Sequence, residues 1–153
     1  LELVMNEIKV KKIAYLETFP VRSAVLRQGK PIETCFFLGD DSDETTHFGL
    51  FNTNKLIGVA SVFKVENENF DKKNQFQLRG MAVLSEYQGS GFGNVLLDEI
   101  CNFVKVKNGE ILWFNARENA VKFYQNYGFS VLGDSFEIPE IGTHFVMFRF
   151  FVV

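Results

Sequence analysis

The sequence is poor in cysteine, and it lacks both an excess of basic charge and any long apolar run. Its two cysteines, Cys35 and Cys101, do not form a disulfide framework, and both stand in apolar segments typical of a core. No apolar run reaches the ~18 residues of a membrane span. The net charge of -3 argues against a nucleic-acid surface, because phosphate contacts need clustered Lys and Arg. We therefore expect a cytoplasmic protein whose partners include neither nucleic acid nor a membrane.

The length of 153 residues suits one domain with a core of its own, and we expect a single domain over residues 1–153. Eighteen phenylalanines predict an aromatic-rich core or an apolar groove. We interpret residues 1–4, which precede Met5, as a remnant of cloning. The two histidines, His47 and His144, have no acidic or cysteine ligand at a suitable spacing, so we expect no metal site.

Apolar periodicity predicts an alternation of strands and helices along the chain. We expect helices over Leu16–Gly29, over 92–107 and over 117–128, the last two ended by Asn108–Gly109 and by Gly128. We expect strands over Ile8–Ala14, His47–Phe51, Lys55–Val65, Phe76–Leu84, Glu110–Ala116 and Thr143–Val153. The order favours an α/β (α+β) fold: a mixed, mostly antiparallel central sheet with one parallel strand pair, flanked by helices.

Three glycines alternate in "YQGSGFG" (residues 87–93), between an expected strand and an expected helix. Glycine lets a ligand approach the backbone closely, and a helix N-terminus offers unpaired N–H groups, so the stretch predicts a phosphate cradle. The dinucleotide pattern G-x-G-x-x-G does not fit, because Asn94 stands at the third position, and no Lys-Ser/Thr pair of a triphosphate loop follows. From these residues alone a simple tight turn remains the alternative.

Two stretches between Phe76 and Phe129 together resemble the GNAT superfamily of N-acetyltransferases. "QLRGMAVLSEYQGSGFGNVLL" resembles the cofactor motif Gln/Arg-x-x-Gly-x-Gly/Ala, matched by Gln88, Gly91 and Gly93. "NARENAVKFYQNYGF" resembles the second motif of that family, and the two occur in the family's order, separated by a strand.

The resemblance implies acetyl-CoA as cofactor, held where two central strands splay apart. It implies that the pyrophosphate binds the backbone N–H groups of Gln88, Gly89, Ser90, Gly91, Phe92, Gly93 and Asn94. It further implies that the pantetheine arm pairs with the backbone of Met81, Ala82 and Val83, with Asn115 near the arm. Helical spacing alone favours a core aromatic at Tyr124, but the match of "FYQNYGF" to the family motif puts it at the position that often protonates the departing thiolate. One departure is Arg117, which stands where many members carry Asn.

The function implied is transfer of an acetyl group to a primary amine of a small molecule or peptide, by direct attack in a ternary complex. The alternatives are a catalytically silent acyl-CoA-binding regulatory module and a structural domain without a ligand. His47 is the first candidate for the general base, and its alternative is a histidine hydrogen-bonded within the sheet; His144 has the same ambiguity. Arg79 is a candidate for a substrate carboxylate or a structural ion pair. Further candidates for the substrate mouth are Arg27, Arg22, Glu33 and Asp40. The aromatic C-terminal strand makes a homodimer plausible.

Overall fold

The structure is a computed structural model that describes residues 7–152. The interpretation of residues 1–4 lies outside the described residues. Contacts group the described residues into two compact units, one formed by residues 7–63 with 80–100 and the other by 64–79 with 101–152. Whether the chain behaves as one domain stays a prediction.

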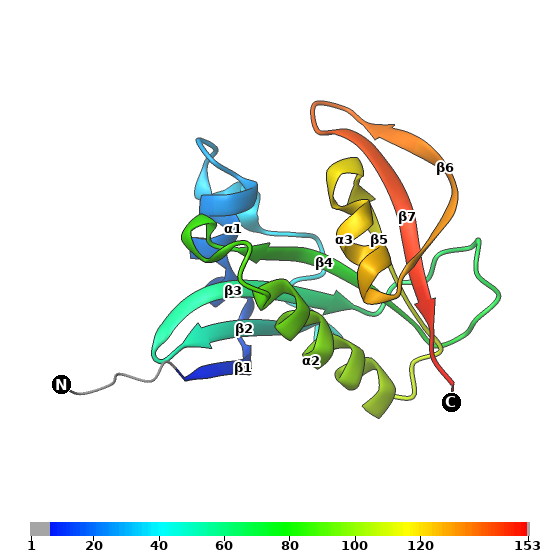
Figure 1. The fold of residues 1–153 in the computed structure, drawn as a ribbon, viewed down its shortest axis with the longest axis horizontal. Coiled ribbons are helices and arrows are strands. Elements are labelled where there is room, and N and C mark those ends of the chain that lie inside the picture. The colour runs from blue at the N-terminus through cyan, green and yellow to red at the C-terminus, as the bar shows by residue number, and fades with distance from the viewer. Residues whose placement is uncertain (1–6, 153) are drawn as a thin grey trace. The chain divides into compact units, whose positions relative to one another are not determined.

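In the first unit, three antiparallel strands form a meander, shown side by side in Figure 1. They are β1 (Ile8–Ile13), β2 (Thr46–Asn52) and β3 (Lys55–Phe63), so the predicted hairpin is confirmed. The expected helix over Leu16–Gly29 is divided into a 3-10 helix, Tyr15–Thr18, and α1, Phe19–Leu26. Pro20 is tolerated because it lies in the first turn of α1, where its missing N–H has no intrahelical partner to lose.

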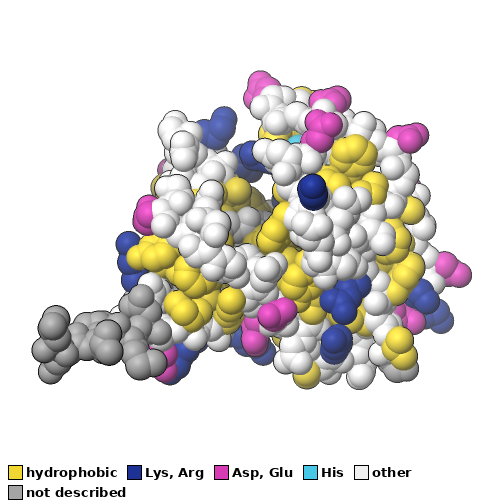
Figure 2. Space-filling model, in the orientation of Figure 1, with side chains coloured by type: hydrophobic (Ala, Val, Ile, Leu, Met, Phe, Trp, Pro, Cys, Tyr) yellow, Lys and Arg dark blue, Asp and Glu magenta, His cyan; other side chains and the backbone are white. Residues whose placement is uncertain are grey.

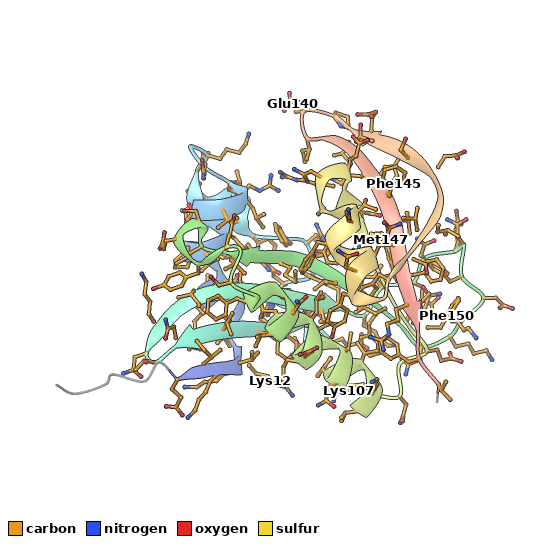
Figure 3. The ribbon with its side chains drawn as sticks, in the orientation of Figure 1. Lys12, Lys107, Glu140, Phe145, Met147 and Phe150 are labelled. Carbon is orange, nitrogen blue, oxygen red and sulfur yellow. The ribbon has the colours of Figure 1, made fainter. Side chains whose placement is uncertain are left out.

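In the second unit, β5 (Ile111–Arg117) pairs antiparallel with β7 (Gly142–Phe150), and β7 pairs antiparallel with β6 (Ser130–Ile138). Helix α3 (Val121–Tyr127) follows β5, and Gly128 ends it as predicted, its N–H donating to the carbonyls of Tyr124 and Gln125. Figure 3 shows Phe145, Met147 and Phe150 along β7, with Glu140 at the β6–β7 turn.

Strand β6 was not predicted, because its sequence does not alternate cleanly. The polar stretch around Asp134 interrupts the apolar positions, and the pairing with β7 shifts register between Leu132 and Phe136. Most of β6 is exposed or half-buried, so burial left little apolar pattern in its sequence.

Strand β4 (Gln75–Val83) and helix α2 (Phe92–Val106) each contribute residues to both units. The strands follow the order β1-β2-β3-β4-β5-β7-β6, which puts β4 at the centre as predicted. The pair β4–β5 is parallel and joins Gln75–Gln77 to Ile111–Trp113. Leu78 and Arg79 continue β4 beyond that ladder, so the pair separates after its first three residues. A mixed, mostly antiparallel sheet with one parallel pair and flanking helices confirms the predicted fold class.

Helix α2 buries one side, as its periodicity predicted. Leu96, Ile100 and Val104 are fully buried, and Leu97 and Cys101 extend the same buried stripe. Within residues 7–152, no helix is both long and apolar enough to cross a membrane. On the face shown in Figure 2, basic side chains lie singly or in small groups among acidic ones and form no single patch.

Candidate functional site

The glycine turn lies between the end of β4 and the start of α2, both within the first unit. The chain leaves β4 at Val83, makes the 3-10 helix Ser85–Tyr87 and reaches Gln88 in an extended conformation. The side-chain amide of Gln88 donates to the carbonyl of Val83 at 2.8 Å. This bond ties the start of the turn to the end of β4 and leaves the turn's backbone groups unoccupied by that side chain.

The backbone of the turn presents a row of unpaired donors. Gly89 and Gly91 have φ of 81° and 85°, a left-handed conformation that favours glycine, and a Cβ added at either would meet no atom within 4 Å. The bond from the Val95 N–H to the Gly91 carbonyl, at 3.3 Å, begins the helical pattern. Among the described residues, none accepts a hydrogen bond from the N–H groups of 89–94. Open space, unpaired N–H groups and the positive end of a 15-residue helix suit a diphosphate.

The strand that leads into the turn supplies the other predicted backbone contacts. Met81 and Val83 are half-buried and Ala82 is buried against Val21 and Val59. Gly80, directly before them, has φ of 65° although it lies inside β4. An isolated glycine in a strand pattern signals a bulge, and this signal was present in "QLRGMAV" but was not used.

His47, the predicted base, lies on β2 and is 5% exposed. Its Nε2 is 2.9 Å from the carbonyl oxygen of Asp40, and its Nδ1 is 2.6 Å from the hydroxyl oxygen of Ser61. Because a carbonyl only accepts, Nε2 carries the proton, and Nδ1 accepts from Ser61. Burial lowers the pKa of His47 from 6.5, against the opposing effect of Asp40. These contacts match the alternative interpretation, a neutral histidine hydrogen-bonded within the sheet; its role as base stays a prediction.

Arg22 and Asp40 form a buried ion pair in the same unit. The guanidinium Nη1 and Nη2 donate to the two carboxylate oxygens at 2.6 and 3.0 Å, and both side chains are 0% exposed. The prediction that these two residues line a substrate mouth is therefore wrong, because each charge is buried and bound to the other. Ser61, which accepts from Arg22 at 2.9 Å and bonds to His47, was missed, because one serine in "VASVF" carries no pattern of its own.

Tyr124, the predicted acid, lies on α3 in the second unit, in an aromatic cluster. Its ring centroid is 4.5 Å from that of Phe114 and 5.1 Å from that of Phe123. Burial raises the pKa of Tyr124 to about 12, so the hydroxyl stays protonated at neutral pH. A protonated hydroxyl is the form that a general acid requires.

The remaining candidates differ in their surroundings. Asn115 is exposed on β5, and Arg117 is exposed at the end of that strand, opposite His144 in the register. His144 is buried, with Nδ1 2.8 Å from the Gly142 carbonyl oxygen. Arg79 is half-buried on β4. Arg27 is half-buried after α1, and its buried Nε has no hydrogen-bond partner among the described residues. The substrate-binding roles of Arg79 and Arg27 stay predictions, as does that of Glu33, which is exposed.

Comparison with known proteins identifies the class. Residues 10–129 match the Acetyltransferase (GNAT) family, which is most of the chain and includes the glycine turn, β5 and α3. The chain belongs to the GNAT family and is an acetyltransferase. The resemblance seen in the two sequence motifs is confirmed.

Individual relatives agree with this assignment. The chain is 30% identical over 142 residues to the uncharacterized N-acetyltransferase YitI of Bacillus subtilis, covering 93% of this chain and 95% of that protein. It is 35% identical over 83 residues to the ribosomal protein bS18-alanine N-acetyltransferase of Haemophilus influenzae, covering 53% of this chain and 52% of that protein. Among solved structures, the ribosomal-protein-S18-alanine N-acetyltransferase of Escherichia coli shares the fold with a TM-score of 0.72 at 19% identity, covering 94% and 92% of the two chains.

Proposed function

We propose that this protein transfers an acetyl group from acetyl-CoA to a primary amine of a small molecule or peptide, in a ternary complex. The observation that carries the proposal is the row of N–H groups at residues 89–94, which have no acceptor among the described residues and open space beside Gly89 and Gly91. Family membership supplies the cofactor class, because GNAT enzymes generally use acetyl-CoA. The relative that acts on the alanine of ribosomal protein bS18 supports a peptide amine as one acceptor class.

The proposed roles divide between backbone and side chain. Acetyl-CoA supplies an acetyl thioester. The N–H groups from Gly89 to Asn94 hold its diphosphate, whereas the N–H of Gln88 donates to the Ser85 carbonyl at 3.3 Å. The backbone of Met81–Val83 pairs with the pantetheine arm, and one of its N–H groups stabilises charge on the thioester oxygen. Tyr124 donates a proton to the departing thiolate, and its hydroxyl is protonated at neutral pH, as this role requires.

The attacking amine must be neutral, so a base or a water path has to remove its proton. His47 is the predicted base, but its Nδ1 lone pair accepts from Ser61 and its Nε2–H donates to the Asp40 carbonyl. A base in this position would have to break the Ser61 bond first. The contacts therefore favour a structural role for His47. The test is the dependence of kcat/KM on pH: if the fall in rate at low pH is the same in His47→Gln as in the wild type, His47 is not the base.

A transferase screen tests the proposal. The purified protein is incubated with acetyl-CoA and a panel of small-molecule amines and peptides with free N-termini, while thiol release and acetylated product are measured by absorbance and mass spectrometry. We expect product with at least one acceptor and stoichiometric thiol. Binding of acetyl-CoA without product from any amine would favour the silent regulatory module, and no binding at all would overturn both.

A further inference from the structure

The direction of the N–H groups at the end of β4 depends on one backbone conformation. Gly80 lies inside the strand with φ of 65°, directly before Met81. A left-handed residue breaks the regular pleat and reorients the strand beyond it, as glycine does at a bulge. The conformation of Gly80 therefore determines the directions of the N–H groups of Met81–Val83.

Two side chains from distant parts of the sequence pack directly on Gly80. A Cβ added there would lie 2.8 Å from Phe37 Cε2 and 3.4 Å from Arg22 Nε, so ring and guanidinium already fill the space beside the Cα. The guanidinium carbon of Arg22 also lies 3.9 Å from the centroid of the Phe37 ring, a cation–π stack. Gly80 thus faces a wall made by these two groups.

Arg22 is fixed in one orientation by bonds at both ends of its planar group. Nη1 donates to the Cys35 carbonyl at 2.7 Å and to Asp40 at 2.6 Å. Nη2 donates to Asp40 at 3.0 Å and to the Ser61 hydroxyl at 2.9 Å. Asp40 also accepts from the N–H of Phe37 at 2.8 Å, so one carboxylate holds both parts of the wall.

The energetic cost of this arrangement argues for a role beyond stability. A buried ion pair is often no more stabilising than apolar side chains of the same volume, because both charges lose their hydration. The two Nη groups of Arg22 are bonded to three partners, and only its buried Nε, which faces Gly80, has no acceptor among the described residues. Such a planar fork fixes a single geometry, which apolar side chains do not. The Arg22–Asp40 pair is therefore suited to hold β4 in one backbone direction beyond Gly80.

We infer that Arg22 is a positioning residue for acetyl transfer: with Phe37 it holds Gly80 in its left-handed conformation and so aims the one backbone N–H of Met81–Val83 that is proposed to stabilise charge on the thioester oxygen. The inference rests on the proposed function. Arg22 does not touch the reacting atoms in this role and acts through Phe37 and Gly80.

The test compares Arg22→Lys and Phe37→Leu with Val62→Ala. Lysine keeps the charge without the planar fork, and leucine removes the aromatic wall while the ion pair stays. Val62 is a buried neighbour of Ser61 on β3 whose side chain points to the opposite face of the sheet, so its variant controls for destabilisation. All variants are checked for folding by thermal melting. We expect the kcat of both test variants to fall at least about tenfold relative to Val62→Ala, because small misplacements of reacting groups are costly. The Kd for CoA should change by a smaller factor than kcat, because the glycine turn that is proposed to hold the diphosphate is unaltered in both variants.

A second measurement does not depend on activity. In the ligand-free protein labelled with ¹⁵N-methionine, alanine and valine, the amide resonances of Met81–Val83 should move in Arg22→Lys and Phe37→Leu and stay in place in Val62→Ala. Unmoved resonances in both test variants would overturn the inference, and so would a kcat equal to that of the control. If the wild-type protein transfers no acetyl group, the proposed function fails, and the amide resonances still decide whether Arg22 sets the strand.

Discussion

Gly91→Val is the sharpest probe of the glycine turn. A β-branched residue at φ of 85° is strained by about 1–3 kcal/mol, but a Cβ there meets no atom of the protein within 4 Å, so the fold survives. For a chain of this size that strain lowers the Tm by roughly 2–10 °C. The new side chain fills the space in which the diphosphate is proposed to lie. Loss of two charge-assisted hydrogen bonds at about 1.5–3 kcal/mol each weakens CoA binding by about 100-fold to 10,000-fold.

Gly29→Val is the matched control. Gly29 has φ of 73°, and a Cβ added there also meets nothing within 4 Å, but it follows α1 and lies outside the turn. Both variants should lose similar stability in thermal melts. Calorimetric titration with CoA should show a large loss of affinity for Gly91→Val and a change within about twofold for Gly29→Val. Tight CoA binding by Gly91→Val, or an equal loss in both variants, refutes the phosphate cradle.

Three further predictions follow from the structure. Tyr124→Phe should lower kcat by about 100-fold or more while the Kd for CoA stays within about threefold, because it removes one proton donor and keeps the ring; Tyr127→Phe is its control, and an unchanged kcat excludes the acid role. The folded state holds His47 with a lowered pKa, so its contribution to stability is present above pH 6.5 and is lost as the pH falls through the folded pKa. In urea unfolding below pH 6.5, His47 should make the free energy of unfolding fall by at most about 1.4 kcal/mol per unit of decreasing pH. His47→Gln should remove this dependence, and a dependence that persists in the variant contradicts the assignment. Asp40→Ala should lower the free energy of unfolding by about 3–5 kcal/mol, because it leaves the Arg22 charge buried alone. The double variant Arg22→Met with Asp40→Leu should lose less stability than the sum of the two single variants. Strict additivity would contradict the coupling.

The fold was predictable because local pattern and tertiary position agree for most elements. The apolar stripe of α2 carries a helical period that burial imposes, whereas β2, β3 and β4 are apolar runs with few charges, as buried strands are. Strand β6 lacks one, because it is mostly exposed and its pairing with β7 shifts register at Asp134. Strand β6 is held by backbone hydrogen bonds to β7, which require no particular side chains and so leave no pattern in its sequence.

The charged candidates were harder to place for a different reason. Arg22 and Asp40 are 18 positions apart in the sequence, and each alone is typical of a solvated surface. Only the fold brings them together with Ser61, which converts two expected surface charges into one buried pair. The expected cytoplasmic location, the absence of a nucleic-acid partner and the homodimer stay predictions.

Backbone and side-chain recognition leave different traces in a sequence, so the sequence predicts a class of cofactor but no particular acceptor. A ligand bound by N–H groups requires glycine where φ is positive, so the requirement at Gly89 and Gly91 is written directly as residue type. An acceptor amine is recognised by side chains, and many combinations of acids, aromatics and hydrogen-bond acceptors can do this equally well. The same logic applies to Gly80. The glycine itself is visible in the sequence, but Phe37 and Arg22, which pack against it, come from a distant part of the chain and are brought to it by the fold. If Phe37→Leu leaves both the amide resonances of Met81–Val83 and the turnover unchanged, the glycine alone sets the strand, and the buried ion pair serves packing.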